Sequence, residues 1–209
     1  MSQGLRTELV SYELDGRTYD LFVARPPGSE PRPAVQVMHA WSGRDRFMEG
    51  KARQLAGQGY VGVAIDLYGV GRRGTNRASS EALMMELVTD PKALQARLRA
   101  ALEQTRAMDA VDESRVAAMG YCFGGTCAIL AARMGLPLVG TVSVHGLLKI
   151  GEQLATRPAG PLLVLNGTDD PFVPRSDVET FGEEMERIGA RWRLVDYPGA
   201  KHAFAIPKA

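Results

Sequence analysis

The 209-residue sequence has few cysteines and histidines, almost no net charge and no long apolar run. Its formal net charge of +1 leaves no electrostatic footprint for nucleic acid or an anionic membrane. Apolar runs stay well short of the roughly 18 residues that a membrane span needs, and no charged-then-apolar leader opens the chain. We therefore expect a soluble, unexported protein of the cytoplasm that binds neither nucleic acid nor membrane.

Only two cysteines occur, Cys122 and Cys127. Their five-residue spacing spans the start of a predicted helix and points the side chains in different directions, which argues against a disulfide. Reduced thiols fit a cytoplasmic location. Histidines, cysteines and carboxylates do not cluster at metal-ligand spacing, and neither a G-x-G-x-x-G motif nor a phosphate loop occurs. We expect neither a metal nor a cofactor.

The sequence does contain a glycine-flanked cysteine, in the G-x-C-x-G-G stretch 120–125. This stretch follows the apolar run Val116–Met119 and precedes a helical pattern, the strand–turn–helix context in which serine hydrolases carry their nucleophile. Glycine is needed at the flanks of so tight a turn. The N-terminus of a helix also favours a thiolate. Cys122 is therefore a candidate nucleophile, and a structural buried cysteine is the alternative.

Short apolar runs alternate with helical periodicities along the chain. Strands are predicted at Thr7–Leu14, Thr18–Ala24, Val35–Met38, Tyr60–Ile65, Val116–Met119, Leu138–Val144, Leu162–Leu165 and Trp192–Tyr197. Helices are predicted from Phe47 to Gly57 or Gly59, from Pro91 to Met108, after Cys122, and up to Gly189 from a capping box of Ser176 and Glu179. Asp15-Gly16 predicts a hairpin between the first two strands. The pattern indicates a single α/β domain over residues 1–209, with a mostly parallel, doubly wound sheet and an N-terminal antiparallel hairpin.

Polar residues follow the ends of the predicted strands. All three histidines of the chain fall at such positions. Because a solvated histidine could lie anywhere, this clustering favours a functional site. In open α/β sheets, ligands bind at the carboxyl ends of the strands. The polar residues at these ends are His39, Cys122, His145, Asp169, Asp170 and His202.

The chain order nucleophile, acid, histidine is that of α/β-hydrolases. Four stretches resemble the dienelactone hydrolase family: 66–69 (DLYG), 120–125 (GYCFGG), 167–174 (GTDDPFVP) and 201–204 (KHAF). The likeness runs from about Thr7 to the C-terminus. It implies an α/β-hydrolase fold and a Cys-His-Asp triad that acts as a carboxylesterase on small esters or lactones.

Carried over to this sequence, the resemblance implies Cys122 as nucleophile, His202 as base and Asp170 as the acid. The acid is identified as the aspartate four residues before Pro174. From the residues alone, Asp169 and Asp170 are nearly equal candidates, and Asp169 is otherwise readable as a turn or cap residue.

Two backbone donors are expected to bind the oxyanion of the tetrahedral intermediate. The tight turn at Cys122, which we call the elbow, supplies the N–H of Phe123, and the resemblance points to Trp41 for the other donor. The residues expected at a substrate pocket are His39, Ala40, Tyr68, His145, Phe172 and Phe204. Structural readings compete here, because His39 and His145 could serve only to bond loop backbone and the aromatic side chains could be core.

The sequence departs from the family at three points. Ala40 replaces the family glutamate that takes part in activating the thiol. Ile206 stands where true dienelactone hydrolases carry an arginine that grips the substrate carboxylate, which puts dienelactone in doubt as the substrate. Arg72 and Arg73 could grip an acid instead, although a solvated loop is the simpler reading. The chain also stops at Ala209, without the usual C-terminal helix, so it is either a shortened form or one whose sheet face a partner covers.

Two other functions compete with a hydrolase. The thiol could serve as a redox sensor, although no resolving cysteine lies nearby. The fold could instead bind a ligand without catalysis, since fold does not fix function. A homo-oligomer is possible under any of these readings.

Overall fold

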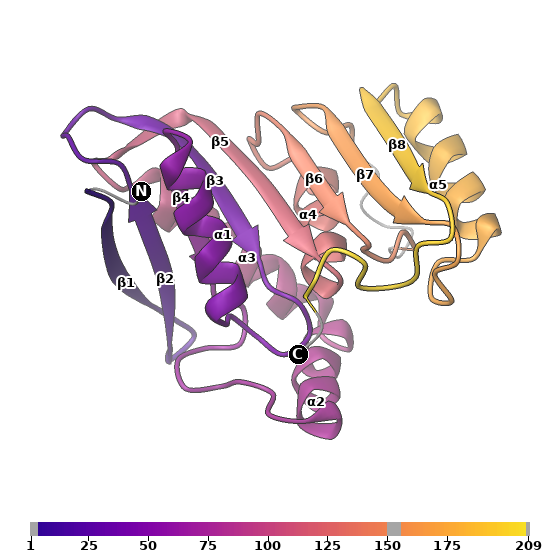
Figure 1. The fold of residues 1–209 in the computed structure, drawn as a ribbon, viewed down its shortest axis with the longest axis horizontal. Coiled ribbons are helices and arrows are strands. Elements are labelled where there is room, and N and C mark those ends of the chain that lie inside the picture. Colours follow the sequence, from indigo (N-terminus) through magenta and orange to yellow (C-terminus); the bar gives the residue numbers. More distant parts are fainter. Residues whose placement is uncertain (1–3, 150–155, 208–209) are drawn as a thin grey trace. The chain divides into compact units, whose positions relative to one another are not determined.

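The computed structural model describes residues 4–149 and 156–207, which form eight strands and five helices (Figure 1). The chain divides into two compact units, Met1–Ala117 and Ala118–Ala209. Strand β5 (Val111–Tyr121) begins in the first unit and ends in the second. The single domain expected over the whole chain stays a prediction.

The first unit combines an antiparallel hairpin with a parallel strand pair. Its other elements are β1 (Arg6–Leu14), β2 (Arg17–Arg25), β3 (Arg32–Met38), α1 (Arg46–Gly57), β4 (Val61–Ile65), α2 (Arg77–Val88) and α3 (Pro91–Arg106). The strands follow the order β1-β2-β4-β3, antiparallel except for the parallel pair β3 and β4. Asp15 and Gly16, with φ of 50° and 71°, form the hairpin turn that the sequence predicts.

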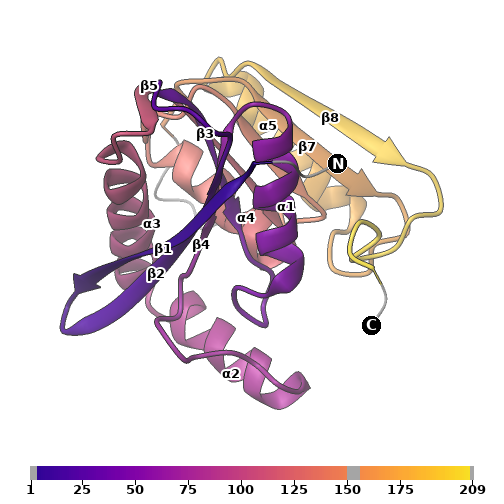
Figure 2. The ribbon, with the colours of Figure 1, turned by 60° about the vertical axis from the view of Figure 1, so that its left-hand side comes forward.

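Helices α1 and α3 pack on opposite sides of the strands of this unit (Figure 2). Helix α3 begins as predicted, with Asp90 accepting a hydrogen bond from the N–H of Ala93 and Pro91 in the first turn. Helix α2 was not predicted from the sequence, because its apolar residues do not form a single stripe. It begins at a capping box between Asn76 and Ser79.

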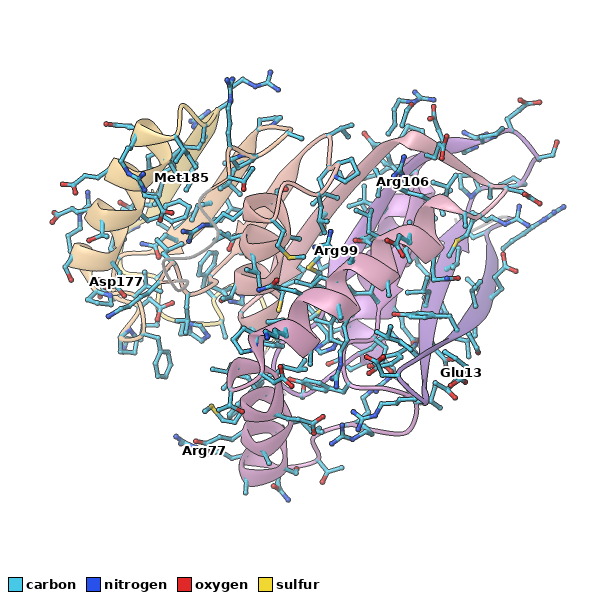
Figure 3. All side chains as sticks on the ribbon, turned by 180° about the vertical axis from the view of Figure 1, so that it is seen from behind. Glu13, Arg77, Arg99, Arg106, Asp177 and Met185 are labelled. Carbon is cyan, nitrogen blue, oxygen red and sulfur yellow. The ribbon has the colours of Figure 1, made fainter. Side chains whose placement is uncertain are left out.

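The second unit is a parallel sheet with two helices on one face. Its elements after β5 are α4 (Phe123–Arg133), β6 (Thr141–Val144), β7 (Leu162–Gly167), α5 (Arg175–Arg187) and β8 (Trp192–Tyr197). The strands follow the order β5-β6-β7-β8, all parallel. Helices α4 and α5 cover the same face, as Figure 3 shows from behind. Between them, the core packs Ile129 of α4 with Phe181 and Met185 of α5 over Leu162 and Val164 of β7.

Several boundaries differ from the sequence-based prediction, among them those of β5, β6 and α5. Strand β5 is longer, and β6 begins only at Thr141, because the N–H of Leu138 bonds to the carbonyl of Leu136 rather than to a neighbouring strand. The capping box predicted at the start of α5 is wrong. The N-cap is Pro174, which makes no side-chain capping bond, and Ser176 lies inside the first turn.

The α/β class, the parallel strand pairs and the N-terminal hairpin agree with the prediction. Within the described ranges, no helix follows β8 and none is both long and apolar enough to span a bilayer.

Candidate active site

Cys122 occupies a sharp turn between the end of β5 and the start of α4. Its backbone has φ 53° and ψ −120°, a left-handed conformation that costs an L-residue energy. A Cβ on Gly120 would overlap the carbonyl oxygen of Gly124, and one on Gly125 would lie 2.8 Å from Oγ of Ser143. The turn therefore needs glycine at both positions, as the sequence predicts. Neither cysteine forms a disulfide in the described chain, and Cys122 is partly exposed whereas Cys127 is buried.

Cys122, His202 and Asp170 lie in a hydrogen-bonded row, which we call the Cys122–His202–Asp170 array. Nε2 of His202 lies 3.1 Å from Sγ of Cys122, and Nδ1 lies 2.7 Å from Oδ2 of Asp170. An ionised carboxylate can only accept, so Nδ1–H donates to Asp170 and Nε2 faces the sulfur. The segment after β8, which carries His202, runs back beneath the carboxyl ends of β7 and β6 (Figure 1). The three side chains come from three different strand ends.

Asp170, rather than Asp169, is the carboxylate that reaches His202. Its side chain is fully buried, and Oδ1 accepts a second hydrogen bond from the N–H of Phe172 at 2.9 Å. Asp169 is exposed and accepts from the hydroxyl of Thr168 at 3.0 Å. The turn after β7 thus points its two aspartates in different directions.

The array favours the charged form of His202. Burial by itself disfavours the imidazolium. The hydrogen bond and negative charge of Cys122 favour it, and so do those of Asp170. Together they raise the pKa of His202 to about 9. The imidazolium is therefore favoured at neutral pH when Cys122 carries the negative charge.

His145 contacts Cys122 and His202 of the array and is completely buried. Its Nδ1 accepts a hydrogen bond from the N–H of Cys122 at 3.0 Å, and its ring centroid lies 5.3 Å from that of His202. Burial, and next the positive charge of His202, lower the pKa of His145 to about 4. The ring is therefore neutral at neutral pH.

Backbone strain gathers around this array. Among the described residues, four non-glycine residues have positive φ, and three of them are Cys122, His145 and Ala203, which follows His202. Strained residues of this kind gather at functional sites, where the surrounding structure holds them. Histidine is among the residue types enriched at positive φ, whereas alanine is not, so the strain at Ala203 has no signal in the sequence.

Two phenylalanines predicted at the pocket lie against the histidines of the second unit. The ring of Phe172, whose residue is 61% exposed, lies edge-to-face on His202 at 5.0 Å. The ring centroid of Phe204 lies 5.3 Å from that of His145 and 5.1 Å from that of Tyr197. Phe172 is thus an exposed apolar surface beside the imidazole that faces the thiol.

The pocket residues predicted in the first unit brace its loops. Nδ1–H of His39 donates to the carbonyl of Ala40 at 2.7 Å, and Nε2 accepts from the N–H of Leu67 at 3.1 Å. The hydroxyl of Tyr68, which is fully buried, donates to the carbonyl of Trp41 at 2.9 Å. Burial lowers the pKa of His39 to about 4. A contact of Trp41 or Ala40 with the reaction stays a prediction, because these residues belong to the first unit and Cys122 to the second.

The arginines considered for substrate binding are engaged within their own unit. Arg72 makes a two-point contact with Glu86, at 2.9 and 2.6 Å. Arg73 contacts Oδ2 of the buried Asp66 at 3.1 Å. The other oxygen of Asp66 accepts from the N–H of Tyr68 at 2.9 Å, so the 66–69 motif holds its loop together. In the described part of the chain, no group of three or more His, Cys, Asp or Glu side chains could hold a metal ion.

Comparison with known proteins places the chain in a family. The model of the dienelactone hydrolase family matches residues 19–209. The chain belongs to the dienelactone hydrolase family. This assignment confirms the resemblance that the four sequence stretches indicate.

Relatives of this dienelactone hydrolase family member cover nearly all of it. A probable 2-oxo-3-(5-oxofuran-2-ylidene)propanoate lactonase of Bradyrhizobium sp is 28% identical over 97% of this chain and 86% of its own length. A dienelactone hydrolase-like promiscuous phosphotriesterase from metagenomic libraries has a TM-score of 0.90 at 29% identity, over 96% of this chain and 84% of that one. A putative dienelactone hydrolase from Klebsiella pneumoniae subsp. pneumoniae MGH 78578 has a TM-score of 0.81 at 27% identity, over 97% of this chain and 89% of that one. These matches confirm the α/β-hydrolase fold.

Proposed function

We propose that this carboxylic ester hydrolase cleaves a small ester or lactone through a thioester on Cys122, with His202 as base and Asp170 as its partner. The observation that carries the proposal is the Cys122–His202–Asp170 array, in which 3.1 Å separates sulfur from Nε2 and 2.7 Å separates Nδ1 from carboxylate. Hydrogen-bond reach between nucleophile and base, with the base oriented by a third group, is the signature of covalent catalysis. The family and the lactonase relative support the substrate class.

The proposed reaction begins with attack of the Cys122 thiolate on the acyl carbonyl. The tetrahedral oxyanion accepts a hydrogen bond from the N–H of Phe123, the first residue of α4, and we assign Trp41 as the second donor. The imidazolium of His202 then protonates the departing alkoxide as the C–O bond breaks. His202, neutral again, takes a proton from a water molecule that attacks the thioester. The acid leaves, and the thiolate–imidazolium pair is restored.

Asp170 contributes by fixing one tautomer of His202. With Nδ1–H held on the carboxylate, Nε2 is the nitrogen that exchanges protons with the sulfur, the leaving group and water. Asp170 is itself fixed by the N–H of Phe172. Its charge also stabilises the imidazolium that forms in each half of the reaction.

The test is mass spectrometry of the intact protein after incubation with a panel of aryl esters and lactones. We expect an acyl adduct on Cys122, and Cys122→Ala should abolish both adduct and turnover. Cys127→Ala is the matched control, because Cys127 is buried inside α4 whereas Cys122 is the N-cap of that helix and is partly exposed. Full turnover by Cys122→Ala would refute the mechanism. Peroxide reactivity without turnover would indicate the redox function instead, and ligand binding without adduct the non-catalytic one.

A further inference from the structure

We infer that His145 is a positioning residue of this site, which holds the backbone of Cys122 and the ring of His202 as a neutral imidazole protonated on Nε2. The inference rests on the proposed hydrolase function, which assigns no role to this side chain. Because His145 is completely buried, it acts through its two neighbours rather than by touching the substrate.

The first observation is the hydrogen bond to the nucleophile's own backbone. The N–H of Cys122 lies 3.0 Å from the carbonyl of Val144 and also 3.0 Å from Nδ1 of His145. A ring nitrogen that accepts an N–H carries a lone pair, so the proton of the neutral ring is on Nε2. A backbone at φ 53° persists only where its surroundings hold it, and Nδ1 of His145 is one of the groups that hold Cys122.

The second observation is that the loop of His145 is pressed onto the first turn of α4. A Cβ on Gly146 would lie 2.6 Å from the carbonyl carbon of Gly125 and 2.6 Å from Oγ of Ser143, so the loop has no room for a side chain at this position. The N–H of Leu147 donates to Oγ1 of Thr126 at 2.9 Å. Such close packing transmits a displacement of His145 directly to the elbow.

The third observation is the contact with the proposed base. The rings of His145 and His202 meet edge to face, with centroids 5.3 Å apart. The titratable groups around His145 are His202 on the C-terminal segment, Asp170 after β7, Cys122 at the elbow and Tyr121 at the end of β5. A neutral His145 supports the His202 ring without opposing its positive charge, and the lowered pKa of His145 agrees with this state.

Two costs to the folded state fall on this one residue. His145 has φ 41°, and its Nε2 is buried without a hydrogen-bond partner among the described residues. Asparagine or glycine would satisfy the backbone better, because both adopt positive φ readily. The histidine therefore contributes something that the backbone conformation alone does not require, and its Nδ1 acceptor is that contribution.

The experiment compares two substitutions that both tolerate the backbone. His145→Asn places an amide oxygen near the position of Nδ1, whereas His145→Gly removes the acceptor and relaxes the backbone. With an aryl ester as substrate, we expect His145→Gly to lose about 100-fold in kcat with little change in KM, as for a misplaced reacting group. His145→Asn should recover most of that loss. Alkylation of Cys122 by iodoacetamide should likewise be slower in His145→Gly and recover most of its rate in His145→Asn.

Nitrogen-15 NMR of the unsubstituted protein gives a readout that does not depend on the variants folding. We expect His145 to show the neutral Nε2–H tautomer throughout the range from pH 5 to 9. The Nδ1–H tautomer, or equal kcat and alkylation rates in the Gly and Asn variants and the unsubstituted protein, would overturn the inference. The unsubstituted protein could turn over no ester while Cys122 is still alkylated more slowly in His145→Gly than in His145→Asn and the unsubstituted protein. In that case the proposed function fails and the positioning role stands.

Discussion

Sγ of Cys122 lies 3.1 Å from Nε2 of His202, although 80 residues separate the two in the chain. Through this contact, the hydrogen bond and negative charge of Cys122 favour the imidazolium of His202.

His202 should be the only histidine that titrates on the alkaline side of neutrality. Its pKa of about 9 contrasts with about 4 for both His39 and His145. In proton NMR, a single imidazole signal should therefore inflect near pH 9, and in Cys122→Ser that inflection should move down, because the sulfur's hydrogen bond and charge are gone. Because the pKa of His202 in the folded state lies above the ordinary 6.5, its protonation stabilises the folded protein against unfolding. This stabilisation is complete below pH 6.5 and is lost as pH rises through 9. An inflection near 6.5 in the unsubstituted protein would contradict the ion pair.

Asp170→Asn should cost on the order of 10⁴ in kcat, because the imidazole loses the partner that fixes its tautomer. Asp169→Asn is the matched control. Asp169 is exposed and bonds to the hydroxyl of Thr168, so its substitution should leave kcat nearly unchanged. Steady-state kinetics on one aryl ester measures both. A larger loss for Asp169→Asn would reverse the assignment of the acid.

Gly120→Ala should destabilise the elbow, because the new methyl group would overlap the backbone carbonyl of Gly124. We expect a loss of about 3 kcal/mol in the free energy of unfolding, the upper part of the usual range for overpacking, since backbone gives way less easily than a side chain. Gly50→Ala in α1 is the control of opposite sign. A Cβ there meets nothing within 4 Å, so helix propensity should stabilise it by about 0.5–1 kcal/mol. Urea unfolding of both variants measures the difference, and equal midpoints would contradict the close approach at Gly120.

Phe172→Ala should weaken substrate binding more than folding. The residue is 61% exposed, so truncation removes little buried area, but its ring forms an apolar surface 5.0 Å from the His202 ring. We expect KM for an aryl ester to rise about tenfold, which corresponds to about 1.4 kcal/mol. The melting temperature should stay nearly constant, and Phe172→Leu should show a smaller rise in KM because it keeps an apolar group. An unchanged KM in Phe172→Ala would mean that the ring does not meet the substrate.

The sequence alone determined the elements whose signals are local. The glycines around Cys122 mark a turn that no other residue fits, and Asp15-Gly16 marks the hairpin, because both depend on backbone dihedrals that few residues adopt. The placement of polar residues after strands also located the candidate site, since the carboxyl ends of parallel strands meet at one edge. Helix α2 escaped prediction because it lacks a single apolar stripe, and the cap of α5 was misplaced because Ser176 lies within the helix rather than before it.

The tertiary structure decided what depends on contacts between distant residues. From the residues alone, Asp169 and Asp170 could not be separated, and only the family resemblance favoured Asp170. The choice depends on which carboxylate packing directs toward a histidine 32 residues away. The opposite pKa shifts of His145 and His202 likewise have no signal in the sequence. One ring is fully enclosed and accepts a hydrogen bond from an uncharged N–H, while the other lies between a sulfur and a carboxylate. Burial and partner charge, which set a pKa, exist only once the strand ends have come together.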